Sequence, residues 1–502
     1  MITKVEFDAL AREYKVISVV EKIFSGSESP LSVFEKLASD KAGSFLLESA
    51  EQGVWSRYSF VGVENLGYLH STASGLKWVS SNGVHPLPSD AADFSALPTF
   101  EALEALQRSW NAAPVTGLPP LVAGLVGLLS WDSVHQIESL GTNKPQDFPL
   151  PDLAMAVIRD LVVIDHQQSS LHLVSNAYIS DDADLDFEYE SAIGRINAMK
   201  KGLLQDSRPF LADVEFSSEL EFSRRTSDKE FHEMVNQAKQ HVIAGDAFQV
   251  VLSQRFEMPV QAEPLDVYRM LRALNPSPYM YLLNFFDESG AFSVVGSSPE
   301  ALVRVQNGKA SLHPIAGSRP RGVTVEEDSA LAQELAEDAK ERAEHLMLVD
   351  LARNDLLKVC YPDSVSVTEF MAVERYSHIM HLVSTVEGTV LPDSSAVGVV
   401  KAAFPAGTLS GAPKPRALEI IEDIEQTNRG LFGGVVGYFD FAGNADLAIA
   451  IRTAVLRNGM AYVQAGAGIV LDSDPSLENQ ETLNKASAPL RAVHAANRMK
   501  RF

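Results

Sequence analysis

Cysteine is almost missing from this sequence, since there is only one, Cys360, among 502 residues. A single cysteine cannot form an internal disulfide, nor can it build a cysteine cage for a metal. Cys360 also lies in the apolar segment LLKVCYPDS, which is not the electropositive setting of a nucleophilic thiol. The sequence therefore excludes a disulfide framework and gives no indication of cysteine catalysis.

Positive charge and long apolar runs are scarce as well. Against 66 acidic residues there are 42 basic ones, and the net charge of −24 disfavours nucleic acids and anionic membranes as partners. No apolar run approaches the ~18 residues that suggest a membrane span. The N-terminus lacks the apolar stretch of a signal peptide. We therefore expect a soluble, cytoplasmic protein.

The length of the chain exceeds one ordinary hydrophobic core, which predicts two or more domains. No repeat of fixed period is present, so a solenoid or propeller is not expected. The polar segment 207–227 predicts a boundary between an N-terminal domain, residues 1–210, and a second domain, residues 225–497.

The second domain is predicted to open with a helix, because Ser227 and Glu230 form a capping-box pattern and Gly245 follows an apolar face. The next segment, 248–256, alternates like a strand with one face formed by Phe248, Val250, Leu252 and Phe256. Further helices are predicted at about 326–347, 413–426 and 475–497, and strands at 292–295, 434–441 and 461–471. Clustered strands favour an α+β fold with large antiparallel sheets.

Two of these helices carry paired carboxylates. Glu341 and Glu344 lie three residues apart, hence on one helix face, and Glu478 and Glu481 repeat the spacing. Mg²⁺ prefers oxygen ligands and commonly takes carboxylates together with an anionic ligand. The pairs therefore indicate a magnesium site, with solvated helix faces as the alternative.

Two glycine-rich segments are candidates for anion binding. Residues 407–414, GTLSGAPK, run into a predicted helix, whose free backbone N–H groups suit an anion, although the segment is not a P-loop. Gly466, Ala467 and Gly468 end a strand but lack the third glycine of a dinucleotide fingerprint. Tight turns are the alternative for both segments.

Basic side chains occur in settings that suggest function. Arg452 lies in an apolar strand, where an anionic ligand or a structural ion pair must meet its permanent charge. Arg319 and Arg321 lie among small residues in the segment 315–322. His378 and His381 lack the further ligands of a zinc site, so proton transfer is favoured over metal binding. A buried structural histidine remains the alternative.

Together these segments resemble the chorismate-binding enzyme family over residues 225–495. The matching segments, in chain order, are GDAFQVVLSQRF, SSPEALV, PIAGSRPRG, KERAEHLMLVDLARND, RYSHIMHLVS, GTLSGAPK, FGGVVGYF, IRTAV, QAGAGIV and ENQETLNKA. The segments SFLLES, WSRYSFVG and NPSPYMY narrow the resemblance to the large subunits of anthranilate synthases.

The resemblance implies two large antiparallel sheets packed orthogonally with helices outside, and an enzyme that converts chorismate and ammonia to anthranilate and pyruvate. It implies that Mg²⁺ is held by Glu344 and Glu481, with Glu341 and Glu478 supporting through water. The implied catalytic residues are Glu300, as general acid, with His381 and Thr408. The implied substrate contacts are Gly317, Ser318, Phe432, Arg452, Gly466, Ala467, Gly468 and Lys485.

Two positions separate the branches of this family. Members that add water carry a lysine where this chain has Gln249, and aminodeoxychorismate synthases carry a covalent lysine where it has Ala316. Both differences favour the anthranilate branch, with an aminodeoxychorismate synthase or a non-catalytic tryptophan-binding homologue as alternatives. Ser318 and Phe432 replace the usual threonine and tyrosine, which affects substrate affinity rather than reaction type.

The resemblance also implies a partner and an inhibitor. The chain ends at Phe502, directly after the last predicted helix, so ammonia is expected from a separate glutamine amidotransferase subunit. Tryptophan is expected to inhibit by binding at Ser49, Pro278, Tyr279 and Met280. The alternative is that SFLLES is only a buried strand and NPSPYMY a rigid turn.

Overall fold

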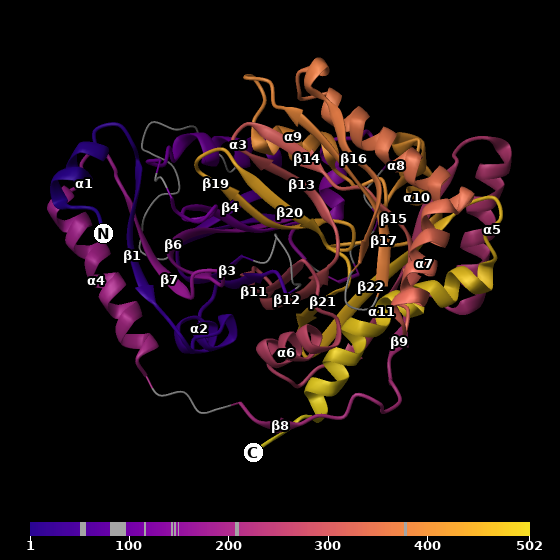
Figure 1. The fold of residues 1–502 in the computed structure, drawn as a ribbon, viewed down its shortest axis with the longest axis horizontal. Helices are drawn as coiled ribbons and strands as arrows, with labels where there is room; N and C mark the ends of the chain where they lie inside the picture. Colours follow the sequence, from indigo (N-terminus) through magenta and orange to yellow (C-terminus); the bar gives the residue numbers. More distant parts are fainter. Residues whose placement is uncertain are drawn as a thin grey trace.

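The computed structural model describes residues 1–50, 57–80, 97–114, 117–141, 144, 147–148, 150–205, 210–375 and 379–502. Within these residues 21 strands join into one antiparallel sheet, two short strands (Ala212–Asp213 and Lys500–Arg501) pair separately, and the helices lie mainly around the outside of the large sheet (Figure 1). The predicted α+β class with antiparallel sheets is confirmed. The strands expected in two sheets are linked edge to edge into this one network.

The N-terminal half supplies seven of the longer strands. They are β1 (Val16–Phe24), β2 (Ser44–Glu48), β3 (Tyr58–Thr72), β4 (Gly75–Ser80), β5 (Gly124–Leu129), β6 (Leu153–Asp165) and β7 (Ser170–Tyr178). The helices of this half are α1 (Lys4–Leu10), α2 (Pro30–Leu37), α3 (Thr99–Ser109), the 3₁₀ helix η2 (Trp131–Gln136) and α4 (Leu185–Leu203).

The C-terminal half begins after the short strands β8 (Ala212–Asp213) and β9 (Ser223–Arg224). Its other strands are β10 (Gln249–Pro259), β11 (Tyr279–Asp287), β12 (Gly290–Ser298), β13 (Ala301–Gln306), β14 (Lys309–Leu312), β15 (Ile315–Pro320), β16 (Ser366–Arg375), β17 (Ile379–Thr389), β18 (Gly411–Ala412), β19 (Val435–Asp440), β20 (Ala445–Ile449), β21 (Thr453–Arg457), β22 (Met460–Ile469) and β23 (Lys500–Arg501). Its helices are α5 (Asp228–Ala244), α6 (Pro264–Leu274), α7 (Val325–Glu337), α8 (Ala339–Leu357), the 3₁₀ helix η3 (Pro362–Ser364), α9 (Ala396–Ala403), α10 (Lys414–Ile424) and α11 (Pro475–Arg498). None of the described helices is long and apolar enough to cross a membrane.

The two halves share strand pairings. Strand β2 pairs with β11, and β5 pairs with β19, so both halves contribute strands to the same sheet. One hydrophobic core contains Leu46 from β2 together with Leu282 from β11. The division into domains 1–210 and 225–497 therefore stays a prediction. The large sheet contains strands from both of these ranges.

Most predicted helices are confirmed, with one difference. Ser227 and Glu230 form the expected capping box on α5, and Gly245 ends that helix with a φ of 82°. The single helix expected at about 326–347 is instead two, α7 and α8. Asp338 separates them, because its side chain accepts hydrogen bonds from the backbone N–H groups of Lys340 and Glu341 and so caps α8.

One predicted strand residue differs in its surroundings. Strand β10 begins at Gln249, and the side chain of Phe248 just before it is 75 % exposed, whereas Val250, Leu252 and Phe256 are fully buried. Phe248 therefore lies at the end of the sheet and not in the core. The remaining face of the strand packs as predicted.

Strand register and helix packing bring the candidate segments together. Across β10 and β22, Ser253 lies opposite Gly466 and Val251 opposite Gly468. Across β15 and β17, Ser318 lies opposite His381. Helix α8 packs on β15 and β17, and α11 packs on β22. These contacts place the two carboxylate-bearing helices beside the strands that carry the other candidates (Figure 1).

Candidate active site

Glu300 and Thr408 come together from distant parts of the chain. The Thr408 hydroxyl donates a hydrogen bond of 2.9 Å to Glu300 Oε1. Burial raises the pKa of Glu300 to about 7, while the bond from Thr408 and the charge of Lys485 act in the opposite direction. A carboxyl group with a pKa near neutrality is suited to give or take a proton.

The same two side chains line a pocket of about 410 Å³. Its other walls are mostly apolar and come from α8, β13, β14 and the segment between α9 and β18. Apolar walls solvate a carboxylate poorly, which is the physical cause of the raised pKa of Glu300.

Arg452 and Lys485 form the second part of the site. Arg452 Nη1 donates a 2.7 Å hydrogen bond to the backbone oxygen of Lys485, and Lys485 Nζ donates one of 3.1 Å to the oxygen of Gly466. No described carboxylate lies within ion-pair distance of the Arg452 guanidinium, although burial lowers its pKa. The alternative of a structural ion pair is therefore not seen among the described residues, and binding of an anionic ligand by Arg452 stays a prediction.

The glycines opposite strand β10 allow their neighbours to pack closely against the backbone of β22. A Cβ atom on Gly466 would lie 2.7 Å from the oxygen of Leu252, and one on Gly468 would lie 2.5 Å from Gln249 Nε2. Neither position accepts a side chain without a shift of its neighbours. We call residues 466–468 the glycine cradle, since only glycine at 466 and 468 allows this close packing.

His381 belongs to the third part of the site. Its Nδ1 lies 3.0 Å from the carbonyl oxygen of Gly317, so Nδ1 carries the proton of this bond. Burial is the main cause of its lowered pKa, so the ring is neutral at pH 7. Gly317 has a φ of 69°, and a Cβ there would lie 2.9 Å from Glu341 Oε2. His381, Gly317 and Glu341 are thus neighbours.

The carboxylates of α8 and α11 affect one another. Burial raises the pKa of Glu344 and of Glu478, and the negative charge of Glu481 raises both further. The negative charges of α8 and α11 therefore lie close enough to influence each other. Nearby cations partly balance it: Lys485 lies 2.6 Å from Glu481, Arg319 lies 3.3 Å from Glu341, and Lys340 lies 3.8 Å from Glu344.

The four carboxylates fit Mg²⁺ by their chemistry. They offer oxygen ligands, and a dication would relieve the repulsion that raises the pKa of Glu344 and Glu478. Among the described residues, no three acidic, histidine or cysteine side chains are grouped closely enough to hold a metal ion. Lys485 and Arg319 are bound to two of the carboxylates instead, so metal binding requires these side chains to rearrange.

The remaining basic and glycine-rich candidates have structural partners. Arg319 also pairs with Glu334 and Asp338, and Arg321 pairs with Asp328. At the start of α10, the buried Lys414 pairs with a carboxylate of α8 at 2.9 Å. These contacts favour a structural role for the two arginines. His378 lies outside the described residues.

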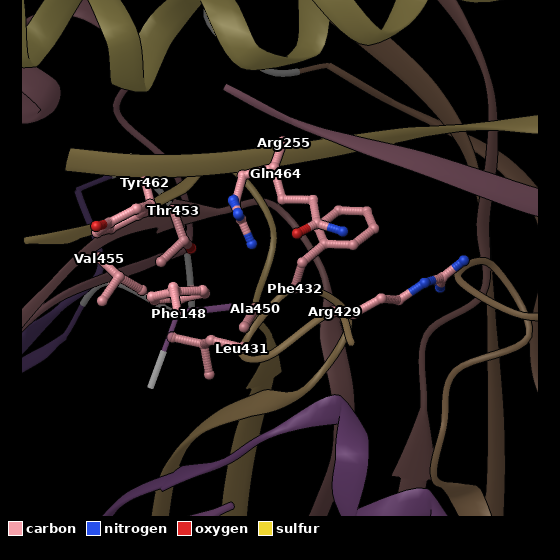
Figure 2. Close-up of a pocket in the computed structure, with 10 residues that line it drawn as sticks. All are labelled: Phe148, Arg255, Arg429, Leu431, Phe432, Ala450, Thr453, Val455, Tyr462 and Gln464. Atoms are coloured by element: carbon pink, nitrogen blue, oxygen red, sulfur yellow. The ribbon is translucent and has the colours of Figure 1, made fainter. Parts of the chain in front are cut away.

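Phe432 separates the glycine cradle from a second pocket. Its ring carbon Cζ would lie 3.3 Å from a Cβ on Gly466, so the ring packs directly behind the cradle. The second pocket has about 320 Å³ and is shown in Figure 2. Its lining includes Phe148, Arg255, Phe432, Tyr462 and Gln464.

The two segments that carry the predicted effector residues lie side by side. Met280 in β11 lies opposite Glu48 in β2, and the backbone N–H of Ala50 bonds to the oxygen of Ser277. The Ser49 hydroxyl is buried and has no hydrogen-bond partner among the described residues. An unsatisfied buried hydroxyl costs roughly 1–3 kcal/mol, which a ligand with a polar group would recover.

Sequence reasoning missed one cluster beside the site. Arg429 and Glu425 form an ion pair of 2.7 Å in the interior, next to the segment that carries Thr408. The spacing of four residues is visible in the sequence, but it is common on exposed helices. Only burial, which the sequence did not reveal, distinguishes this pair.

Comparisons with known proteins find relatives over nearly the whole chain. The profile of a family described as chorismate binding enzyme matches residues 45–491. Two curated relatives named anthranilate synthase component 1 are similar over nearly the whole chain. The one from Mycolicibacterium smegmatis is 49 % identical, over 98 % of this chain and 93 % of its own. The one from Arthrobacter globiformis is 48 % identical, over 98 % and 92 %.

A solved structure has the same architecture. The crystal structure of anthranilate synthase component I from Streptococcus pneumoniae superposes with a TM-score of 0.75 at 34 % sequence identity. The alignment covers 94 % of this chain and 99 % of that one. The similarity therefore extends through both halves.

Proposed function

This chain belongs to the chorismate-binding enzyme family, and we propose that it converts chorismate and ammonia to anthranilate and pyruvate. The observation that carries the proposal is the carboxyl of Glu300, held by Thr408 with a pKa of about 7. The glycine cradle and the Arg452 guanidinium, which has no ion-pair partner among the described residues, support it. The enzyme is a lyase, because pyruvate leaves in the second half of the reaction.

Substrate binding follows from charge and shape. The Arg452 guanidinium and the backbone N–H groups of the glycine cradle bind the carboxylate of the enolpyruvyl group. Lys485, Gly317 and Ser318 supply further contacts. Phe432 closes the back of the cradle by packing against Gly466. Such a set of donors around a rigid backbone orients the ring for reaction.

Proton transfer is divided between two side chains. As ammonia adds to C2 of the ring, protonated Glu300 gives its proton to the C4 hydroxyl, which leaves as water. In the second half, neutral His381 accepts the C2 proton as the bond between C3 and the ether oxygen breaks. The departing enolate takes up a proton at its methylene carbon and so becomes pyruvate. Gln249 lies over Gly468 and carries no basic group, so it cannot activate water in place of ammonia.

We also propose that the enzyme uses Mg²⁺. Glu344 and Glu481 would hold the ion, with Glu341 and Glu478 supporting through water. Bound there, it would bind the ring carboxylate of chorismate and neutralise charge as the hydroxyl departs.

An aminodeoxychorismate synthase is the nearest alternative. That reaction uses a lysine where this chain has Ala316, which lies in β15 one residue before Gly317. Without a nucleophile at this position the anthranilate reaction is favoured. The fluorescence of anthranilate distinguishes the products.

The source of ammonia gives the first test. We propose that a separate glutamine amidotransferase subunit supplies it in the cytoplasm, because Cys360 is buried and burial raises its pKa to about 11. The purified chain with chorismate, Mg²⁺ and an ammonium salt at alkaline pH is expected to form anthranilate. Glutamine alone is expected to give no product until the partner is added. Glutamine turnover by the single chain would contradict the second statement, and absence of anthranilate with ammonium would contradict the function.

We propose that tryptophan inhibits the enzyme at the effector residues Ser49, Pro278, Tyr279 and Met280. The amino acid needs hydrogen-bond partners for its ends and an apolar slot for its indole. The Ser49 hydroxyl, which has no partner among the described residues, offers the first, and buried Met280 offers an adaptable wall for the second. Because β2 and β11 come from the two halves, the ligand would bias how they are held together.

Ser49→Phe tests this proposal. The ring would fill the space of the ligand, so the tryptophan concentration for half-inhibition is expected to rise at least about tenfold, on the order of 1.4 kcal/mol. Ammonia-dependent activity should stay near normal. Ser74→Phe, which adds the same ring at the exposed turn between β3 and β4, is the matched control and should leave inhibition unchanged. Equal inhibition of the Ser49 variant and the unmutated enzyme would place the effector elsewhere.

A further inference from the structure

Arg429 and Glu425 form an ion pair in the interior that the reaction scheme does not use. Glu425 follows the last residue of α10, and Arg429 lies in the loop before β19. Arg429 Nε donates to Glu425 Oε2 at 2.8 Å, and Nη2 donates to Oε1 at 2.7 Å. The side chains are only 1 % and 6 % exposed. Burying two charges is costly unless their remaining hydrogen-bonding positions are satisfied.

The other guanidinium donors go to two backbone oxygens of the active-site region. Nη1 donates to the oxygen of Leu409 at 2.9 Å, and Nη2 donates to the oxygen of Val251 at 2.7 Å. Leu409 directly follows Thr408. Val251 lies opposite Gly468 across β10 and β22. The planar guanidinium of Arg429 thus binds both the segment that carries Thr408 and strand β10, which pairs with the glycine cradle.

Glu425 holds the same strand two residues further along, at Ser253. Its Oε1 accepts hydrogen bonds from the backbone N–H and the hydroxyl of Ser253, at 2.8 and 2.9 Å. Ser253 lies opposite Gly466, the other glycine of the cradle. Gln464 Nε2 donates to the same hydroxyl at 2.8 Å. The carboxylate and the guanidinium therefore hold β10 beneath both glycines.

Aromatic rings enclose the pair. The guanidinium carbon of Arg429 lies 4.2 Å from the centre of the Trp131 ring and 5.7 Å from that of Phe432. Trp131 belongs to η2 of the N-terminal half, whereas Phe432 lines the pocket in Figure 2. Rings over a guanidinium exclude water and add a cation–π attraction.

We propose that Arg429 and Glu425 are positioning residues that fix Thr408 and the glycine cradle relative to each other in the active site. They touch no reacting atom. Their pair sets the distance between the hydroxyl that bonds Glu300 and the backbone that binds the substrate carboxylate. The proposal rests on the proposed function, since it assigns these two elements to one reaction.

The shape of the guanidinium, and not only its charge, is what the arrangement uses. Arg429 makes four hydrogen bonds in one plane to three different groups. A lysine ammonium is a point charge on a flexible stem and cannot reproduce a planar fork. Arg429→Lys therefore keeps the charge that Glu425 needs while releasing the Leu409 and Val251 carbonyls.

The test compares Arg429→Lys with Arg457→Lys. Arg457 is a matched control, because it is buried, binds Asp287 through both terminal nitrogens and lies 5.5 Å from the centre of the Phe292 ring, away from the site. For Arg429→Lys we expect kcat of the ammonia reaction to fall at least about tenfold while KM for chorismate changes less than about threefold. For Arg457→Lys we expect kcat to stay within about twofold of the unmutated enzyme even where the melting temperature falls.

A pH profile separates positioning from loss of stability. The hydrogen bond from Thr408 lowers the pKa of Glu300, so a displaced Thr408 lets that pKa rise above about 7. With rates divided by the concentration of neutral ammonia, the basic limb of kcat/KM should move to higher pH in Arg429→Lys and stay fixed in Arg457→Lys. Thr408→Val removes the bond directly and should move the limb in the same direction.

A variant that combines Arg429→Lys with Thr408→Val decides whether Arg429 acts through Thr408. If it does, Arg429→Lys adds no further shift of the limb to Thr408→Val, because the bond is already lost. The proposal would be overturned if the shifts of the basic limb of the pH profile were additive in the combined variant. It would also be overturned if this limb stayed in place in Arg429→Lys alone. Should Arg429→Lys fail to fold, Glu425→Gln gives the same readout, since the amide keeps the shape and loses the charge. Anthranilate formation by the unmutated enzyme tests the proposed function independently of these results.

Discussion

Replacing Glu344 or Glu481 by glutamine is expected to remove nearly all activity. Each change takes one charged ligand from the proposed magnesium site, and loss of several kcal/mol of transition-state stabilisation corresponds to a fall of about 10³-fold in kcat/KM. Treatment with EDTA should abolish the activity of the unmutated enzyme, and added Mg²⁺ should restore it. The assay is anthranilate fluorescence with ammonium as nitrogen donor.

Stability should respond differently from activity in the Glu344 variant. Burial and the neighbouring carboxylates raise the pKa of Glu344, so its charged form is disfavoured in the folded state. Above that pKa the charge lowers the free energy of unfolding, and glutamine removes this effect. Without Mg²⁺, Glu344→Gln should therefore melt at the same temperature as the unmutated enzyme or higher.

Glu419→Gln is the matched control for both measurements. Glu419 makes the same kind of charge pair, with Arg416 on α10, but is exposed and far from the candidate ligands in the chain. It should change neither activity nor its dependence on Mg²⁺. Near-normal turnover of Glu344→Gln and Glu481→Gln at low Mg²⁺ would remove these residues from the metal site.

Glu300→Gln is expected to give a comparably large loss, about 10²–10⁴-fold in kcat/KM, because an amide cannot protonate the departing hydroxyl. In the unmutated enzyme the acid form of Glu300 is present below its pKa of about 7 and is lost as the pH rises through it. The rate per concentration of neutral ammonia should therefore decline above about pH 7.

Glu300→Asp provides the comparison for this prediction. Aspartate keeps a titrating acid at a shorter reach, so part of the activity and a basic limb should remain. Glutamine should abolish the limb together with the rate. If Glu300→Gln retains the pH dependence of the unmutated enzyme, another group is the general acid.

Local features of the fold were predictable from the sequence, because they depend on neighbours in the chain. The capping box of Ser227 and Glu230 and the glycine that ends α5 are set within a few residues. The break at Asp338 was missed because the helical pattern continues through it. The available signal was Asp338 itself, because aspartate is a preferred N-cap residue and can accept hydrogen bonds from the backbone N–H groups two and three residues later.

Contacts between distant segments were not predictable in this way. The carboxylate pairs on α8 and α11 were visible as patterns, but the influence of Glu481 on Glu344 depends on how the helices pack. Phe248 continues the alternation of β10 and still lies outside the core, because the strand begins one residue later, at Gln249. Assigning Glu300 required the resemblance to a known family, since a lone glutamate carries no local signal.

The strand pairings between the halves have a consequence for how the chain reaches its native state. Within the N-terminal half, β3 pairs with one edge of β2, and β6 pairs with one edge of β5. Among the described strands, the other edge of β2 pairs with β11 and the other edge of β5 pairs with β19, both from the C-terminal half. During synthesis these two edges stay open until residues 279–287 and 435–440 have left the ribosome. Open strand edges are templates for aggregation. The N-terminal half is therefore expected to depend on the completed C-terminal half, or on a chaperone, until translation is nearly finished.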